Sequence, residues 1–226
     1  MPLTKISINN FRCFKYVDLQ LSPGINFFYG KNGSGKTSIL ESVFIFSSGK
    51  SFKSSNLASL INYENDKFTL KAFDNLKGYV VEIKKNKNKP ISVLLNNKKI
   101  TTSKLIKEFP CTPIHNNTFS FADAPPDFRR KLLDRSIFIS EKSFSESWFS
   151  YYRSLKQRNS ILKNNRISSI YTWNTKLSDE GIKLTNMRKN FFKKTKNEFY
   201  YLIDLIQPNS VFDFFNLIEI DFFQGW

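Results

Sequence analysis

Cysteine and histidine are scarce in this sequence of 226 residues, which holds two cysteines and one histidine. Cys13 and Cys111 stand far apart with no second cysteine near either, and His115 is the only histidine. A zinc site or a disulfide framework is therefore not expected. This cysteine usage is typical of a reducing, cytoplasmic setting.

Long hydrophobic runs are also missing. No apolar stretch approaches the length of a membrane span, and the first ten residues lack the core of a signal peptide. We therefore expect no membrane partner. Hydrophobic residues nevertheless make up 40% of the chain, with 24 phenylalanines, which argues against disorder. The length suits one domain, or one domain with an appendage.

Acidic residues are few relative to basic ones: 19 Asp and Glu against 35 Lys and Arg, a formal net charge of +16. Such a charge favours polyanionic partners, and nucleic acid is the first candidate. The composition has a second explanation, because an AT-rich genome enriches lysine, asparagine, isoleucine and phenylalanine without selection for binding. Both explanations stay open on charge alone.

One motif carries most of the functional information. The segment matches G-x-x-x-x-G-K-[ST], the phosphate-binding loop of nucleoside triphosphatases, and consists of Gly30, Lys31, Asn32, Gly33, Ser34, Gly35, Lys36 and Thr37. Glycines let backbone N–H groups turn inward around an anion, and the following helix adds its positive dipole end. Lys36 can reach the β- and γ-phosphates, and the Thr37 hydroxyl can ligate Mg²⁺.

The flanks of this loop predict the strand–loop–helix context that the motif requires. Ile25–Tyr29 is a short aromatic and β-branched run, entered through Pro23-Gly24, and it predicts a buried strand. After the loop, a helix is expected from near Lys36, with Ile39, Leu40, Val43 and Phe44 on one face and Ser47–Gly49 at its end.

The rest of the first half reads as strands. Thr4–Asn9 and Val17–Leu21 alternate between polar and apolar residues, as strands with one buried face do. Three further strands are expected as a meander over residues 67–73, 78–84 and 91–95. The lysine-rich run 85–89 between the last two is interpreted as a solvated hairpin tip rather than a DNA contact.

The second half is predicted to be helical. Pro125-Pro126 suits the first turn of a helix, and helices are expected from there to about Ile206. Two stripes indicate antiparallel helices packed as a hairpin. They consist of Trp148, Tyr151, Tyr152, Leu155, Asn159 and Leu162, and of Leu177, Leu184 and Phe191. After Pro208, apolar residues at positions 212, 214, 218, 220 and 222 predict a return to strand.

Several further blocks of the sequence carry a family resemblance. The first is Asn10-Phe11-Arg12, followed by residues 21–27, which lead into the phosphate loop. The others are Ile39–Glu41, Phe128–Asp134, Leu155–Asn159, Trp173 with Leu177, and Phe223–Trp226. Together these blocks resemble the RecF family of bacterial recombination-repair proteins, and the resemblance covers nearly the whole chain in order.

The resemblance implies an α/β fold: a P-loop ABC-ATPase-type head, with a mixed sheet and a flanking antiparallel β-meander, plus a helical arm. On this basis residues 1–122 are expected to form the N-terminal part of the head and residues 123–207 the arm. Residues 208–226 would be the start of the returning head strands, with the remainder of the head absent. The chain thus resembles a family member truncated at its C-terminus.

The function implied by the resemblance is recombinational DNA repair and replication-fork maintenance. RecF-like proteins bind ATP with Mg²⁺, dimerise on ATP and bind single-stranded and linear double-stranded DNA without sequence preference. Together with other recombination mediators they assist recombinase loading, and they also assist SOS induction. By match to the family motif, Arg12 would lie near the nucleotide and Thr37 would ligate Mg²⁺. Our candidate DNA contacts are Arg129, Arg130, Lys156 and Arg158.

Two parts of an ABC ATPase site are missing from the sequence: the signature of the Leu-Ser-x-Gly-Gln type, and a Walker B strand ending in acids. Leu177–Gly181 is similar in sequence to the signature, and Leu132–Asp134 is similar to a Walker B strand, but both segments are predicted to lie within helices. Catalytic residues therefore stay unassigned. A complete RecF-like protein would be a weak ATPase. The alternatives are a non-catalytic remnant that binds nucleotide and DNA, or a small P-loop kinase.

Overall fold

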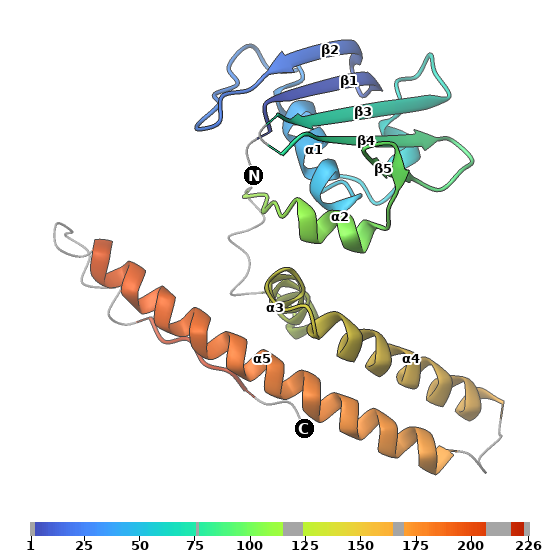
Figure 1. The fold of residues 1–226 in the computed structure, drawn as a ribbon, viewed down its shortest axis with the longest axis vertical. Coiled ribbons are helices and arrows are strands. Elements are labelled where there is room, and N and C mark those ends of the chain that lie inside the picture. The colour runs from blue at the N-terminus through green and yellow to red at the C-terminus, as the bar shows by residue number, and fades with distance from the viewer. Residues whose placement is uncertain (1–2, 76, 115–123, 165–169, 207–217, 224–226) are drawn as a thin grey trace. The chain divides into compact units, whose positions relative to one another are not determined.

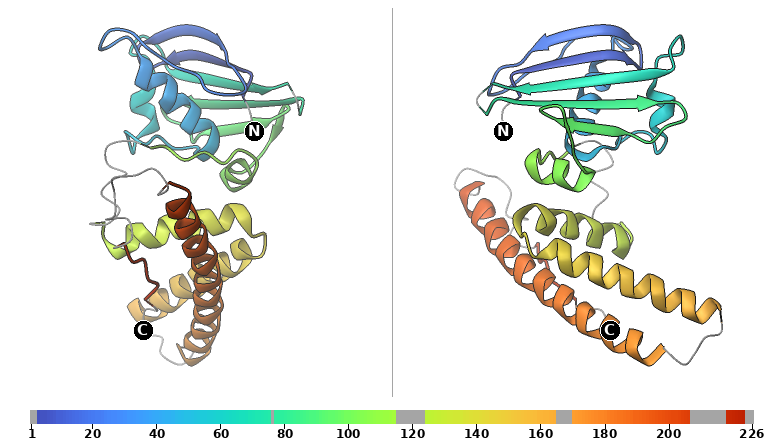
Figure 2. Two further views of the ribbon diagram at one scale, coloured as in Figure 1. Left: turned by 90° about the vertical axis from the view of Figure 1, so that its left-hand side faces the viewer. Right: turned by 45° about the vertical axis from the view of Figure 1, so that its right-hand side comes forward.

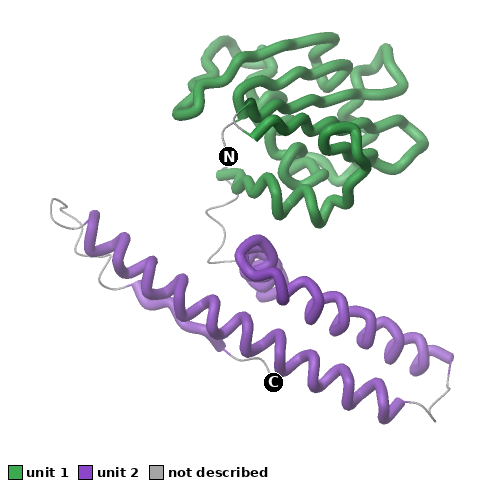
Figure 3. The backbone as a smooth tube through the Cα atoms, in the orientation of Figure 1, with its two compact units in different colours: residues 1–118 green, residues 119–226 purple. Residues whose placement is uncertain are grey.

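The computed structural model describes residues 3–75, 77–114, 124–164, 170–206 and 218–223. The chain divides into two compact units, residues 1–118 and residues 119–226, which Figure 3 colours separately. Each unit is described by itself below. The predicted three-part division of the chain stays a prediction. Within the described residues no helix is long and apolar enough to cross a membrane.

Unit 1 is built on a six-stranded sheet with the strand order β2-β1-β3-β4-β5-β6. Its strands are β1 (Lys5–Phe11), β2 (Phe14–Gln20), β3 (Lys67–Asp74), β4 (Tyr79–Asn86), β5 (Ser92–Leu95) and β6 (Lys98–Lys99). Every pairing between neighbouring strands is antiparallel. Figures 1 and 2 show helix α1 (Lys36–Ser48) on one face of this sheet.

The core of unit 1 follows from alternation along the strands. In β3, Phe68, Leu70 and Ala72 are buried, whereas the residues between them are partly exposed. These side chains pack with Ile45 and Phe46 of α1 in one hydrophobic cluster. The burial of one sheet face against a helix gives this unit its hydrophobic stabilisation and holds α1 against the sheet.

Two short elements complete unit 1. A 3₁₀ helix, η1 (Leu57–Leu60), follows the loop after α1, and helix α2 (Thr102–Glu108) follows β6. The Thr101 side chain accepts a hydrogen bond from the Lys104 backbone N–H, which caps the start of α2. None of η1, β6 and α2 was predicted from the sequence.

The α/β class and the antiparallel meander are confirmed. Among the described residues, however, the sheet is antiparallel throughout instead of mixed. The strands predicted at Thr4–Asn9, Val17–Leu21 and over residues 67–95 are found within a few residues of their expected bounds. Hairpin alternation and turn residues identify such strands because each one needs only a sequence neighbour as its partner.

The strand predicted at Ile25–Tyr29 is wrong. The structure assigns no strand there, and the side chains of Ile25, Phe27 and Tyr29 are largely exposed. The segment begins as a turn held by Asn26, whose side chain accepts from the Ser22 N–H and donates to the Ser22 carbonyl. No strand among the described residues pairs with this segment, so its backbone has no ladder to join.

Unit 2 contains three helices, α3 (Pro126–Ser140), α4 (Phe144–Lys163) and α5 (Ile170–Ile206). Pro126 occupies the first turn of α3, as predicted. Helices α4 and α5 lie side by side in both Figure 1 and Figure 2, as the two stripes predicted. The three helices share an apolar core formed by Ile137 of α3, Phe144 of α4 and Leu184 of α5.

Gly181 lies within α5 beside Tyr151 of α4. A Cβ on this residue would lie 3.5 Å from Cε2 of Tyr151, which is an ordinary van der Waals contact. The packing therefore leaves room for alanine at this position, and glycine costs the helix about 1 kcal/mol relative to alanine.

The return to strand predicted after Pro208 is not found where it can be checked. Residues 207–217 lie outside the described residues, and Ile218–Phe223 form no strand. This short segment instead contacts α5: Lys196 pairs with Asp221 at 2.8 Å, and the ring of Phe222 lies 5.7 Å from that of Phe192. Contacts with a helix satisfy its side chains, but they do not supply the strand partner that a ladder needs.

Candidate nucleotide-binding site

The loop between residues 30 and 37 has the backbone that an anion-binding loop needs. Gly30, Gly33 and Gly35 have φ values of +144°, +83° and +93°, a region that residues with a Cβ rarely adopt. Gly35 is the residue before the first turn of α1, so the loop leads directly into the helix N-terminus. The unpaired N–H groups and the dipole of that helix end favour a negatively charged group.

The Lys36 side chain folds back onto the first residues of this loop. Its ammonium group donates to the backbone carbonyls of Gly30 and Lys31, each at 2.8 Å. These two hydrogen bonds hold the Lys36 ammonium group beside the phosphate loop. A lysine in this position acts as a point charge for a phosphate group.

An open pocket of about 460 Å³ adjoins the loop. It is lined by the second half of the loop, by the turn between β1 and β2, and by the segment after α1. The lining residues are Arg12, Cys13, Asn32, Gly33, Gly35, Lys36, Thr37, Ser38 and Lys53. Among them are three cations and no carboxylate, so the pocket is electrostatically suited to an anion.

Arg12 is held at this pocket by its backbone. Its φ of +55° is uncommon for a residue with a side chain, and the conformation is stabilised from both sides. The Arg12 N–H donates to the Leu60 carbonyl at 2.7 Å, and the Arg12 carbonyl accepts from the Asn62 side chain at 3.0 Å. The structure therefore brings Arg12 to the same pocket as the phosphate loop, and its contact with a nucleotide stays a prediction.

Two residues near the pocket were missed from the sequence. Lys53 lines the pocket from the segment that follows α1, and Glu41 of α1 forms an ion pair with Arg12. For Lys53, the available signal was Gly49, which ends α1 and lets the chain turn back. For Glu41, the signal was a single acid within the otherwise uncharged stretch from Thr37 to Gly49.

The candidate DNA contacts all lie in unit 2. Arg129 and Arg130 are on α3, and Lys156 and Arg158 are on α4. Arg129 and Lys156 are exposed. Arg130 is paired with Asp127 of its own helix, and Arg158 donates to the Asn174 side chain at 2.7 Å. Two of these four candidates therefore already have a partner inside the unit.

The two segments that look like catalytic motifs in sequence have structural roles in unit 2. Asp134, at the end of Leu132–Asp134, is buried in α3 and accepts two hydrogen bonds from Arg188 of α5. Leu177–Gly181 lies within α5 and does not open a helix.

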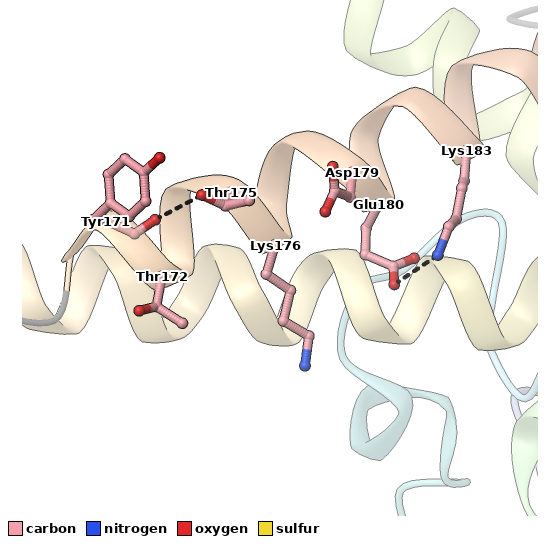
Figure 4. Close-up of a pocket in the computed structure, with 7 residues that line it drawn as sticks. All are labelled: Tyr171, Thr172, Thr175, Lys176, Asp179, Glu180 and Lys183. Atoms are coloured by element: carbon pink, nitrogen blue, oxygen red, sulfur yellow. Dashed lines mark hydrogen bonds and ion pairs between the residues drawn. The ribbon is translucent and has the colours of Figure 1, made fainter.

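A second hollow lies on the surface of α5, where Figure 4 shows its lining residues from Tyr171 to Lys183. All of these residues belong to one helix, and Glu180 and Lys183 pair with each other there. A groove on one exposed helix lacks the enclosing walls of a ligand site. Among the described residues no group of three or more His, Cys, Asp or Glu could hold a metal ion.

Comparison with known families agrees with this geometry. A family model described as the RecF/RecN/SMC N-terminal domain matches residues 2–123. The chain is 32% identical over 232 residues to a protein of Shewanella woodyi named DNA replication and repair protein RecF. It is 33% identical over 232 residues to the protein of that name from Actinobacillus pleuropneumoniae. Both matches cover 100% of this chain, and 61% and 62% of the relatives.

Solved structures show the same likeness. A structure described as the recombination mediator protein RecF with ATPrS in the RecFOR pathway superposes with a TM-score of 0.81 and 25% identity, over 91% of this chain and 58% of that one. The Smc head domain of Pyrococcus furiosus, at 16% identity and a TM-score of 0.53, covers 92% of this chain and 66% of its own and shares the fold. The chain thus spans about three fifths of the curated relatives it matches.

Proposed function

This chain belongs to the family of RecF, RecN and SMC N-terminal domains, and on that premise we propose that it binds ATP and DNA in recombinational repair and replication-fork maintenance. One observation carries the proposal. The curled glycine loop, the Lys36 ammonium inside it and the N-terminus of α1 meet at one pocket that Arg12 also lines. That combination is built for a chain of phosphates.

The residues present fit a bound nucleoside triphosphate. The backbone N–H groups of the loop would hold the phosphate chain, Lys36 would neutralise its outer charge, and Arg12 would approach from the turn between β1 and β2. The nucleotide supplies the phosphate groups on which these residues act. The likeness to a structure described as RecF with ATP, at a TM-score of 0.80 and 25% identity, supports ATP as the ligand.

Magnesium is part of the same proposal. Thr37 lines the pocket, and a hydroxyl oxygen is a ligand that Mg²⁺ accepts. Magnesium in such sites keeps several waters and takes its other ligands from phosphate oxygens. One protein hydroxyl beside the phosphates is therefore sufficient, and no dedicated acidic cage is needed.

The proposed partners follow from charge and from the relatives. With a net charge of +16, the chain suits sequence-independent binding to the phosphates of single-stranded and linear double-stranded DNA. The RecF structure described as part of the RecFOR pathway supports other recombination mediators as partners. An ATP-dependent homodimer, a cytoplasmic location and participation in recombinase loading and SOS induction complete the proposal.

The alternative functions differ in chemistry. A non-catalytic nucleotide- and DNA-binding protein is favoured by one observation, since no carboxylate among the described residues lines the pocket to orient an attacking water. A small P-loop kinase would need an acceptor pocket beside the γ-phosphate, and neither hollow has that form. If the chain transferred phosphate from ATP to a small acceptor molecule, the kinase function would be favoured over the proposed function.

The test is equilibrium titration with a fluorescent ATP analogue in the presence of Mg²⁺. Lys36→Ala removes a charge-assisted contact of about 1.5–3 kcal/mol, so affinity should fall at least about tenfold. Lys99→Ala, which removes an exposed lysine from β6, is the matched control and should leave the affinity unchanged. Equal affinity in the wild-type and Lys36→Ala chains would remove the phosphate loop from the proposed function.

A further inference from the structure

Glu41 is a carboxylate where an apolar residue is expected. It lies in the second turn of α1, next to the phosphate loop, and its side chain is 1% exposed. Its neighbours on the buried side of the helix include Ile45, which belongs to the hydrophobic core. Burying a charge is costly unless it is paired and hydrogen-bonded, so the partners of this carboxylate decide whether its position is stable.

The first partner of Glu41 is Arg12. The Nε–H of Arg12 donates to Oε2 at 3.0 Å, and Nη2 donates to Oε1 at 3.0 Å. This bidentate arrangement fixes the plane of the guanidinium as well as its distance. It uses only one edge of the group, so both N–H groups on Nη1 remain for another acceptor. The Arg12 side chain is 31% exposed and lines the phosphate pocket.

The second partner of Glu41 is Ser51, whose hydroxyl donates to Oε1. The Ser51 oxygen in turn accepts from the backbone N–H groups of Lys53 and Ser54, each at 2.9 Å. The buried carboxylate is therefore the common anchor of two segments. One carries Arg12 and the other carries Lys53, and both residues line the same pocket.

From these contacts we propose that Glu41 is a positioning residue of the nucleotide site, which holds the guanidinium of Arg12 with its outer edge toward the phosphates. The carboxylate does not itself line the pocket. It acts by orienting a cation that would otherwise sample several rotamers, and pre-orientation reduces the entropy lost on binding. Ser51 extends the same control to the segment of Lys53. The inference rests on the proposed binding of ATP.

The test is a double-mutant cycle on nucleotide affinity, with wild type, Arg12→Ala, Glu41→Gln and the double variant. Glu41→Gln keeps the volume of the side chain but loses the charge that pairs with Arg12. Each single change should weaken binding of the fluorescent ATP analogue about tenfold, the size of one charge-assisted contact. If Glu41 acts through Arg12, the double variant should bind no more weakly than Arg12→Ala alone.

Two further variants make the cycle decisive. Glu64→Gln changes an exposed carboxylate that pairs with Lys15 away from the pocket, and it should bind as the wild type does. Arg12→Lys leaves Glu41 in place and keeps the positive charge but cannot form the bidentate pair. It should lose most of the affinity that Arg12→Ala loses, and it tests the geometry even if Glu41→Gln fails to fold.

Two results would overturn the role of Glu41. One is wild-type affinity in Glu41→Gln or in Arg12→Lys. The other is a loss on Glu41→Gln that is equally large in the Arg12→Ala background, because that would be a general effect on the fold. Both differ from failure of the proposed function, in which the wild-type chain shows no affinity or Lys36→Ala binds as tightly as the wild type.

Discussion

Gly35 and Phe14 are packed so closely that a side chain at position 35 would have to displace the Phe14 ring. A Cβ added to Gly35 would lie 2.8 Å from Cε1 of the Phe14 ring and 3.1 Å from Sγ of Cys13. The turn between β1 and β2 thus covers the last glycine of the phosphate loop. The requirement for glycine here is steric as well as conformational, since φ is +93°.

Gly35→Ala should therefore abolish measurable nucleotide binding. The left-handed backbone alone costs a residue with a Cβ about 1–2 kcal/mol. The clash with Phe14 adds to this and must move either the ring or the loop. The measurement is titration with the fluorescent ATP analogue, together with circular dichroism to confirm that the helices and sheet are formed.

Gly78→Ala is the control for the cost of placing a residue with a Cβ in a left-handed backbone conformation. Gly78 has a φ of +63°, but a Cβ there would meet nothing within 4 Å. This variant should lose some stability and keep its affinity for nucleotide. The double variant Phe14→Ala, Gly35→Ala should regain part of the binding. Full affinity in Gly35→Ala would mean that the loop does not need the observed conformation.

The structure shows which kinds of residue pattern were informative. Helices α1 and α3, the meander and the pair α4 and α5 were predicted because their periodicity is local. The ends of α1 and α3 also carry clear signals, Gly49 after α1 and Pro126 at the start of α3. Ile25–Tyr29 failed because a strand exists only with a partner, and composition cannot say whether one lies beside it. The same reason explains the missing strand at Ile218–Phe223.

The site was predictable only in part. The spacing of Gly30–Thr37 identifies the loop because the chemistry fixes it, and Arg12 was placed by resemblance. Glu41 was not recognised, because an acid on a helix is usually solvated, and only the fold shows that its side chain faces Arg12 and Ser51. Lys53 escaped for a similar reason. A lysine beyond a helix end is indistinguishable in sequence from other surface lysines until the chain is folded.

In unit 2, the ion pair between Asp134 and Arg188 should contribute more to the free energy of unfolding than the other polar contacts of the described residues. Their side chains are 12% and 16% exposed, and Trp148 also donates to Asp134. The hydrogen bond to Asp134 raises the pKa of Arg188. A guanidinium stays protonated even without a partner, so removing Asp134 leaves a largely buried and unpaired positive charge. Asp134→Ala should lower the free energy of unfolding of the helical unit by about 3 kcal/mol.

Urea unfolding followed by the fluorescence of Trp148 and its neighbours measures this loss. Asp127→Ala removes an exposed carboxylate of the same helix, paired with Arg130, and should change the free energy of unfolding by less than about 0.5 kcal/mol. The double variant Asp134→Leu, Arg188→Met should recover much of the stability, because no unpaired charge remains. Equal effects of Asp134→Ala and Asp127→Ala would contradict the dominance of the buried pair.

DNA binding should depend on salt and on the basic residues of α3 and α4. Replacing Arg129, Arg130, Lys156 and Arg158 by alanine should weaken binding to both single-stranded and linear double-stranded DNA, without regard to sequence. The slope of log affinity against log salt should become shallower by about 0.7–0.9 for each phosphate that these side chains neutralise. Fluorescence anisotropy at several salt concentrations gives both values.

The matched control replaces Lys85, Lys87 and Lys89 of the β4–β5 hairpin by alanine. Lys85 donates to the carbonyl of Lys89, and Lys87 pairs with Asp66, as expected of a solvated hairpin tip. This variant removes a similar amount of charge and should bind DNA with an almost unchanged salt slope. If the hairpin variant loses more affinity than the helix variant, the DNA-binding surface belongs to unit 1.

ATP turnover is not expected of the described pocket. ATP hydrolysis in a dimer of the ABC-ATPase type requires two groups. One is a carboxylate that orients the attacking water, and the other is a signature loop, supplied by the partner subunit, that contacts the γ-phosphate. Among the described residues no carboxylate lines the phosphate pocket, and Glu41 is engaged with Arg12 and Ser51. Contacts from the loop alone would stabilise the bound substrate and the transition state equally, which gives affinity without rate.

The 226-residue chain, purified alone, should therefore bind ATP and release phosphate no faster than background, with or without linear DNA. The measurement is steady-state phosphate release, with Lys36→Ala as the blank for contaminating ATPases. Turnover that is stimulated by DNA and disappears in Lys36→Ala would show that the described pocket is catalytic. In that case the missing group must be supplied by a residue outside the pocket lining, and the binding-only interpretation would have to be abandoned.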